Sequence, residues 1–289
     1  MSNDQSQSLR AVKDCLAGTA AGIAQVLSGQ PFDTVKVRLQ TAAHSQYTGT
    51  LDCALKLYRS DGLLGFYKGT LTPLLGIGAC VSIQFATNEY MKRFFAANNN
   101  GAPMRPSQFY LAGMAAGLAN AALASPIEHV RIRLQTQSTF SGPLDCIRKI
   151  YSAYGLKGIF RGFFPTAIRE SLGAGAYFFT YESLVARELK KGKRRADISS
   201  IKLCLFGASA GYAFWLSCYP IDVVKSKLQT DSLVKADQRY KSSIGCFRHI
   251  IQIHGVPGLF RGLTPTLLRA APVSAATFMA FEAAMRVLA

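Results

Sequence analysis

One motif occurs three times in the chain at almost constant spacing. It reads proline, any residue, an acid, any two residues and a base, at positions 31–36, 126–131 and 220–225. The prolines are 95 and 94 residues apart. A long internal period constrains the fold strongly, because each copy is expected to form the same supersecondary unit and to pack against the others. The sequence therefore predicts three similar units.

Further features recur in the same order around each motif. Two glycines with four-residue spacing precede the proline, a glutamine follows it by nine residues, and an aromatic-basic-glycine triplet comes later. A glutamate lies 20 residues beyond each triplet glycine. The members are Gly18 and Gly22, Gly113 and Gly117, Gly207 and Gly211, Gln40, Gln135 and Gln229, the triplets 67–69, 160–162 and 260–262, and Glu89, Glu182 and Glu282. Glycines with this spacing allow helix backbones to approach closely in a membrane.

Six apolar stretches, two in each repeat, indicate an all-α membrane protein. They span residues 16–32, 70–88, 106–127, 163–181, 203–221 and 263–281. The chain is 49% hydrophobic and only 17% charged, which disfavours both a disordered protein and a soluble enzyme. Spanning helices need about 20 apolar residues, and they satisfy their own backbone groups in lipid. We expect six transmembrane helices, a short amphipathic helix within each repeat, and both termini on one side.

The repeats are expected at about 11–98, 106–191 and 199–289, within a single membrane transport domain spanning 1–289. The net charge of +17 favours anionic partners such as lipids or acidic metabolites. Nucleic acid is disfavoured, because the basic residues are scattered between apolar runs. The seven cysteines are spaced singly, so the sequence predicts no metal site. No cofactor motif or nucleophile–base pattern is present, and we do not expect an enzyme.

These motifs resemble those of the mitochondrial carrier family, and the resemblance covers residues 12–288. The stretches 69–76 and 125–137 look closest to a fungal amino-acid branch related to ornithine carriers. The stretch 30–40 is similar to carnitine/acylcarnitine carriers, which have histidine where this chain has Gln30. The resemblance implies a monomeric barrel of six tilted helices around a pseudo-threefold axis in the mitochondrial inner membrane. It also implies alternating access to one central site, with the loops inside repeats facing the matrix.

The charged residues of the three motifs are expected to close the matrix side. By resemblance, three pairs between helices would form this matrix gate: Asp33 with Arg131, Glu128 with Lys225, and Asp222 with Lys36. Three glutamines would brace the pairs: Gln40, Gln135 and Gln229. The alternative is three local, solvated ion pairs, each between the acid and the base of one motif.

A second, cytoplasmic gate is expected at the ends of the even helices, where the family has an acid and a base three residues apart. Glu89 has Lys92 at this spacing, whereas the residues three positions after Glu182 and Glu282 are Val185 and Met285. We therefore predict that the matrix gate is the stronger one. The empty protein should then favour the state that is open to the intermembrane space.

Three ionisable residues lie inside the even spans, and such residues are usually functional. They are Arg169, Glu170 and Arg269, and the position equivalent to the arginines in the first repeat is Gly76. The resemblance identifies these as substrate contact positions. An arginine can bind a carboxylate through its planar fork, Glu170 can accept an ammonium group, and Gly76 leaves room for a side chain. The alternative is a structural ion pair between helices.

The expected substrate therefore carries a carboxylate and an amine. The leading hypothesis is a transporter of amino acids or related zwitterions, working by exchange. The second is a carnitine/acylcarnitine transporter, and the third is a carrier-fold scaffold that transports nothing.

The resemblance also implies cardiolipin sites on the matrix side. Helix N-termini present free N–H groups that suit phosphate. The positions concerned are Gly49, Lys68, Gly69, Gly142, Arg161, Gly162, Arg261 and Gly262. Ser242 stands where a third loop glycine is expected. The alternative is that these residues form simple turns and interfacial anchors.

Overall fold

The computed structural model describes the backbone of residues 2–42, 46–99, 102–137, 139–192, 194 and 197–288. Within these ranges it describes all side chains except those of residues 2–16, 200, 235, 278, 281, 282 and 288. The regular elements of the described part are helices, with no strand among them. The all-α class predicted from the apolar stretches is confirmed.

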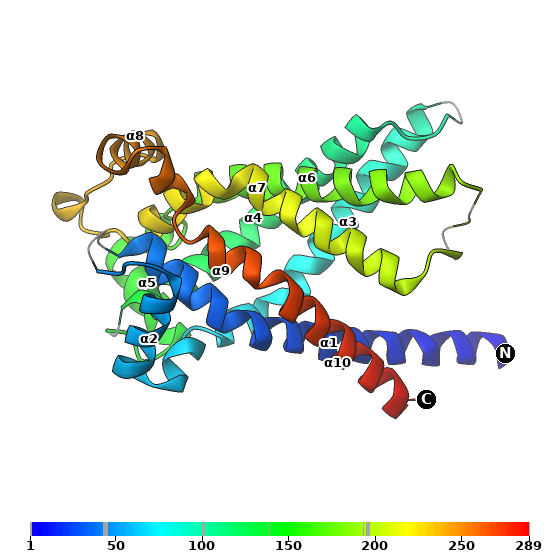
Figure 1. Cartoon of the computed structure of the whole chain (residues 1–289), viewed down its shortest axis with the longest axis horizontal. Helices are drawn as coiled ribbons and strands as arrows, with labels where there is room; N and C mark the ends of the chain where they lie inside the picture. The colour runs from blue at the N-terminus through cyan, green and yellow to red at the C-terminus, as the bar shows by residue number, and fades with distance from the viewer. Residues whose placement is uncertain are drawn as a thin grey trace.

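Each repeat consists of a long helix, a short helix and a second long helix (Figure 1). The first helices of the repeats are α1 (Ser2–Thr41), α4 (Pro106–Thr136) and α7 (Ser200–Thr230). The short helices are α2 (Thr50–Asp61), α5 (Pro143–Ile159) and α8 (Ser243–His254), with the 3₁₀ turns η1 (Leu63–Tyr67), η3 (Lys235–Asp237) and η4 (Val256–Phe260). The second long helices are α3 (Leu71–Asn98), α6 (Phe163–Leu189) and the pair α9 (Leu263–Leu268) and α10 (Ala270–Leu288), which meet at Arg269.

Three helical stretches in the described part are long and apolar enough to cross a membrane by composition. They are Leu63–Asn98, Pro106–Thr136 and Ile201–Thr230. The helix α6 carries Arg169 and Glu170, and both are buried inside the protein. Their burial explains how a long helix can hold charged residues at the depth of the membrane without exposing them to lipid.

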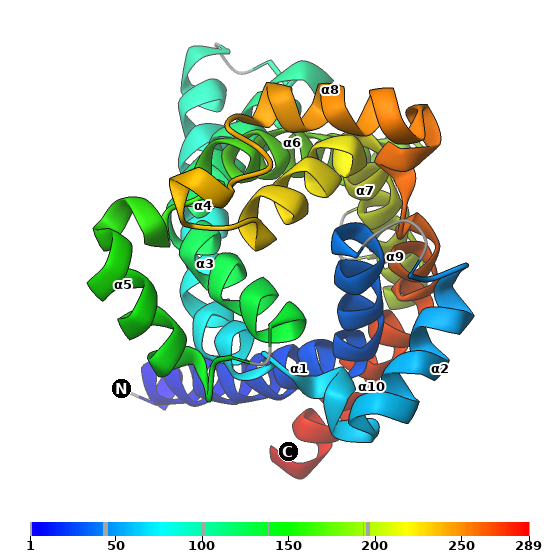
Figure 2. The ribbon, with the colours of Figure 1, turned by 90° about the vertical axis from the view of Figure 1, so that its left-hand side faces the viewer.

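The long helices surround a common axis (Figure 2). Packing is most extensive between α4 and α6, α6 and α7, α3 and α4, and α1 and α10. The contacts between α1 and α3 and between α7 and α10 are much smaller. The barrel therefore consists of a tightly packed group of four helices and a pair formed by α1 and α10.

The glycines of the three aromatic-basic-glycine triplets show the threefold arrangement directly. All have positive φ angles, which favour glycine: 79° at Gly69, 82° at Gly162 and 85° at Gly262. A Cβ atom at each would crowd the first helix of the following repeat. The added Cβ would lie 3.0 Å from the Arg131 carbonyl oxygen at Gly69, 2.7 Å from Gln229 Cγ at Gly162, and 3.2 Å from the Lys36 carbonyl oxygen at Gly262. The three repeats thus contact one another in a closed cycle.

The glycine pairs behave differently in the three repeats. A Cβ atom at Gly113 would lie 2.6 Å from the Ala174 carbonyl oxygen, and one at Gly117 would overlap the Glu170 carbonyl oxygen. By contrast, Gly18 and Gly211 have no atom within 4 Å of such a position. The close approach expected of all three pairs is therefore found only between α4 and α6. The reason is that the helices beside the other two pairs stand further apart.

Candidate functional site

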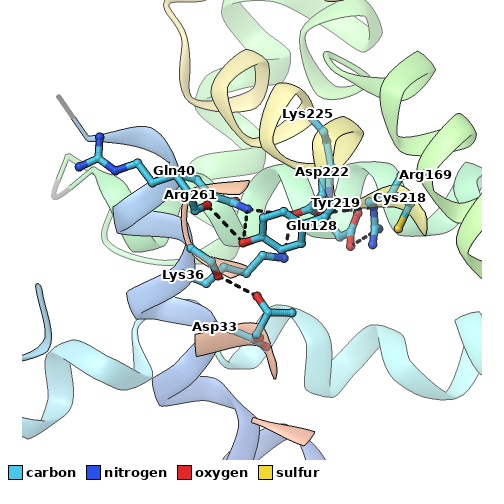
Figure 3. A network of polar contacts seen from close by, with 12 residues as sticks. Asp33, Lys36, Gln40, Glu128, Arg169, Cys218, Tyr219, Asp222, Lys225 and Arg261 are labelled. Atoms are coloured by element: carbon cyan, nitrogen blue, oxygen red, sulfur yellow. Dashed lines mark hydrogen bonds and ion pairs between the residues drawn. The ribbon is translucent and has the colours of Figure 1, made fainter. Parts of the chain in front are cut away.

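A central cavity of about 240 Å³ lies where the three proline motifs meet. Residues of α1, α4, α6 and α7 line it, together with Arg269 at the junction of α9 and α10. The lining includes all six charged residues of the matrix gate and both arginines of the expected contact positions. Their side chains converge from different repeats (Figure 3).

The charged residues of the motifs pair between helices. Lys36 Nζ lies 2.7 Å from Asp222 Oδ2, Arg131 Nη2 lies 2.8 Å from Asp33 Oδ2, and Lys225 Nζ lies 2.5 Å from Glu128 Oε2. These are the pairs predicted from the sequence. The pairs link α1 to α7, α4 to α1 and α7 to α4, so they tie the first helices of the repeats together. Breaking a buried pair leaves an uncompensated charge and is strongly unfavourable.

The glutamines differ in what they bind. Gln40 Nε2 donates to Asp222 Oδ2 at 2.9 Å and to the Tyr219 hydroxyl at 3.1 Å, so it supports one ion pair directly. Gln135 Nε2 donates to Thr34 Oγ1 at 3.2 Å instead of to a charged residue. Both amide atoms of Gln229 are buried and have no hydrogen-bond partner among the described residues. Only Gln40 therefore occupies the expected bracing position.

The residue before the motif proline also joins the network, which the sequence analysis missed. Arg131 Nη2 donates to Gln30 Oε1 at 2.6 Å, while Gln30 Nε2 donates to the Lys68 carbonyl oxygen at 2.9 Å. At the equivalent position of the third repeat, the Tyr219 hydroxyl donates to the Arg261 carbonyl oxygen at 3.2 Å. The signal that could have identified them is a polar side chain directly before Pro31 and Pro220.

Both contact arginines bind acids of the matrix gate. Arg269 Nη1 lies 2.7 Å from Asp33 Oδ1, and Arg169 Nη2 lies 2.7 Å from Glu128 Oε1. Arg169 Nε also lies 3.7 Å from Asp222 Oδ1. The sequence treats the gate and the substrate contacts as separate groups. In the structure both arginines contact gate acids, so Asp33, Glu128 and Asp222 each have an arginine as a second basic neighbour. Figure 3 shows Arg169 beside Glu128.

The other two contact positions lie differently from the arginines. Glu170 Oε1 accepts a hydrogen bond from Arg169, and its Oε2 accepts one from Asn120 Nδ2 at 3.1 Å. A Cβ atom at Gly76 would lie 2.5 Å from Ile127 Cδ1. In this conformation the Ile127 side chain therefore fills the space that the sequence assigns to a substrate side chain.

On the opposite side of the membrane, Lys92 of α3 joins α6. Its Nζ lies 2.8 Å from Glu182 Oε1 and 3.2 Å from Glu89 Oε1. The fourth residue expected in the cytoplasmic gate, Glu282, has a side chain outside the described residues. Lys92 and Glu182 thus form a pair between helices on this side, in the part of the chain whose side chains are described.

The expected lipid contacts separate into two groups. Gly49 lies at the N-terminus of α2 and lines a cavity of about 670 Å³ together with Arg261 and Gly262. In contrast, Lys68 Nζ binds Asp61 Oδ2 at 3.0 Å and Arg161 Nη2 binds Asp231 Oδ2 at 3.0 Å. Gly142 precedes α5, while Gly69 and Gly162 pack against neighbouring helices. The structure therefore brings residues of the first and third repeats together at one cavity.

A barrel of membrane-spanning helices in three repeats, with a charged central cavity between them, defines a solute transporter and not an enzyme. The sequence model of the family described as mitochondrial carrier protein matches residues 7–99, 103–191 and 196–289. The chain belongs to the mitochondrial carrier family, and it is a multi-pass protein of the mitochondrial inner membrane.

Several relatives have names that state a substrate. The glutamate/glycine mitochondrial carrier ymc1 of Schizosaccharomyces pombe is 50% identical over 94% of this chain and 93% of its own length. The mitochondrial glycine transporter YMC1 of Saccharomyces cerevisiae is 50% identical over 98% of this chain and 94% of its own. The mitochondrial basic amino acids transporter of Homo sapiens is 40% identical over 92% of this chain and 87% of its own.

Proposed function

We propose that the protein transports small amino acids across the mitochondrial inner membrane, with glycine and glutamate as its leading substrates, and that it works by exchange. The observation that carries this proposal is the position of Arg169 and Arg269 in one central cavity, with Glu170 bound to Arg169. The names of the relatives support the same class of substrate. The three repeats act as one transport domain and as a monomer.

The charges of the site suit a substrate with a carboxylate and an amine. A guanidinium binds a carboxylate through two parallel hydrogen bonds, and the Glu170 carboxylate accepts an ammonium group. The cavity and Glu170 together hold five basic and four acidic side chains, which leaves one net positive charge. A phosphate-rich ligand such as a nucleotide is disfavoured, because Glu170 beside the contact residue Arg169 would repel its phosphates.

The contacts of the arginines provide a physical link between binding and opening. A substrate carboxylate competes with Asp33 for Arg269 and with Glu128 for Arg169. When the arginines turn to the substrate, the gate acids lose favourable charge interactions, and the matrix gate becomes easier to open. The substrate thus favours the change between the two open states, because it binds the states along this change more tightly than the starting state.

The test is uptake of radiolabelled glycine and glutamate by purified protein in liposomes loaded with candidate counter-substrates, carnitine among them. Arg169→Ala, Glu170→Gln and Arg269→Ala are each expected to abolish uptake. Lys149→Gln is the matched control, because Lys149 is an exposed base outside the cavity whose ion pair is with Asp145 on the same short helix. Normal uptake by all three site variants would make the residues structural, and uptake of carnitine alone would replace the proposed substrate class.

Cardiolipin is the proposed lipid partner. One of its phosphate groups would bind at the N-terminus of α2 near Gly49, with the Arg261 guanidinium contributing charge from the third repeat. A lipid in this position would span two repeats. Melting temperatures of the delipidated protein, with and without added cardiolipin, test this point, and no increase would contradict it.

A further inference from the structure

Asn120 is a polar residue in the apolar span of α4, and it lies against the expected contact residue Glu170. Its side chain is almost completely buried, with 6% exposure. Its Nδ2 donates to Glu170 Oε2 at 3.1 Å. One turn earlier on α4, Gly117 packs against the backbone of Glu170. The two side chains are therefore held together by the closest helix contact in the described barrel.

The second polar atom of the Asn120 amide, Oδ1, is not used in this contact. Asn120 Oδ1 is buried and has no hydrogen-bond partner among the described residues. A buried acceptor without a donor costs free energy that a suitable donor would recover. Nδ2 of the same amide group donates to Glu170 Oε2, so Oδ1 lies near a second acceptor, the Glu170 carboxylate. A ligand that supplies N–H donors would satisfy both.

In the empty protein Arg169 occupies this region. It lines the central cavity, and it donates to Glu170 Oε1 on the other side. Arg169 therefore reaches both the cavity and the Glu170 carboxylate. A substrate carboxylate that draws the guanidinium toward itself would release Glu170 Oε1.

We propose that Glu170 and Asn120 together form the ammonium subsite of the transporter, with Asn120 fixing the Glu170 carboxylate and offering Oδ1 as a further acceptor. The inference rests on the proposed function and specifies its substrate class. A primary ammonium group has three N–H donors, whereas a trimethylammonium group has the same charge and none. The subsite therefore selects amino acids with a free amine over betaines and carnitines, through hydrogen bonds and not through charge.

The experiment compares glycine with N,N,N-trimethylglycine as competitors of labelled glycine uptake in liposomes. The wild-type protein is expected to prefer glycine strongly. Asn120→Ala should reduce this preference about ten-fold or more, because it removes a hydrogen bond to a charged group. Asn120→Ser, which is too short to reach both Glu170 and the ligand, should do the same and replaces the alanine variant if that does not fold. Asn88→Ala removes a second buried asparagine, on α3, and is the matched control.

The outcomes separate this inference from the proposed function. An unchanged preference in folded Asn120 variants would show that Asn120 is only structural and would overturn the inference. A wild-type protein that binds trimethylglycine as well as glycine would also overturn it. If the wild-type protein takes up no amino acid at all, the proposed function is wrong, and the inference that rests on it is overturned with it.

Discussion

At the scale of single residues, two acids of the expected matrix gate each contact two bases. Asp33 contacts both Arg131 of the motif ring and Arg269, and Glu128 contacts both Lys225 and Arg169. A carboxylate has two oxygens and about four lone pairs, so it can accept from two bases at once. Each acid is thereby stabilised in its charged form inside the protein, at a depth where an isolated carboxylate would be very unfavourable.

A residue outside the membrane gives a prediction on pH. Asp61 at the end of α2 accepts from Lys68 Nζ at 3.0 Å and from Arg38 Nη2 at 2.8 Å. The hydrogen bond from Lys68, with help from Arg38, holds the pKa of the Asp61 carboxyl below its usual 3.8. A group whose pKa is lowered by folding stabilises the protein above its unfolded pKa, and this stabilisation is lost as the pH falls through the lowered value.

We therefore expect Asp61→Asn to lower the melting temperature by a constant amount above about pH 5 and by less as the pH falls below the usual carboxyl range. The measurement is thermal unfolding of the purified protein across this range. Asp237→Asn, at an exposed position of η3, is the control. A difference between Asp61→Asn and wild type that does not change with pH would contradict the assignment.

The sequence predicted some residue contacts and not others, for a physical reason. The motif spacing and the family resemblance place an acid and a base on each first helix, so the ring of pairs could be predicted. The depth of Arg169 and Arg269 relative to the motif acids depends on helix tilt, which no spacing reveals. Asn120 could be detected only as a lone polar residue in an apolar span. The sequence did not show that it contacts Glu170 on α6.

At the scale of elements, the interface between α4 and α6 positions the site. Gly113 and Gly117 let the backbones meet, and Glu170 lies within this contact. The three glycine pairs have the same spacing in the sequence, so the sequence could not show that only one of them makes a close contact. That difference depends on how far the barrel is open between α1 and α3 and between α7 and α10.

Gly117→Ala tests the role of this interface. The added Cβ would overlap the Glu170 carbonyl oxygen, so α6 must move away and carry Glu170 and Arg169 with it. Overpacking of this kind costs about 1–3 kcal/mol. We expect a lower melting temperature and a marked loss of amino-acid uptake.

Gly211→Ala is the matched control, because a Cβ atom at this position meets no other group within 4 Å. It should leave both measurements near the wild-type values. Equal effects of the two substitutions would show that the close contact between α4 and α6 does not determine stability or transport.

At the scale of the whole molecule, the two sides of the barrel are held differently. Three pairs between helices lie at the matrix gate expected from the sequence, and Lys92–Glu182 and Lys202–Glu188 join α6 to α3 and to α7 on the opposite side of the described barrel. Arg169 connects two of these pairs, because it contacts both Glu128 and Asp222, and Arg269 gives the third pair a second base at Asp33. The three triplet glycines, through which the repeats contact one another, lie on the same side of the barrel as the three pairs.

We therefore expect the empty carrier to expose its central cavity to the intermembrane space. A version without the native cysteines and with Phe214→Cys allows a direct measurement, because Phe214 of α7 lines the central cavity. A membrane-impermeant thiol reagent should react several-fold faster from the intermembrane-space side. Faster reaction from the matrix side would show that the matrix gate is the weaker one.

The single positive charge that remains when the cavity residues are counted together with Glu170 has a consequence for energetics. An electric potential acts on charge that moves across the membrane, with about 2.3 kcal/mol for one charge and 100 mV. Glutamate would cancel the residual charge of the site, whereas glycine would leave it. The respiratory membrane potential should therefore act differently on the steps that carry the two amino acids, and it can impose a direction on their exchange even when their concentrations are balanced.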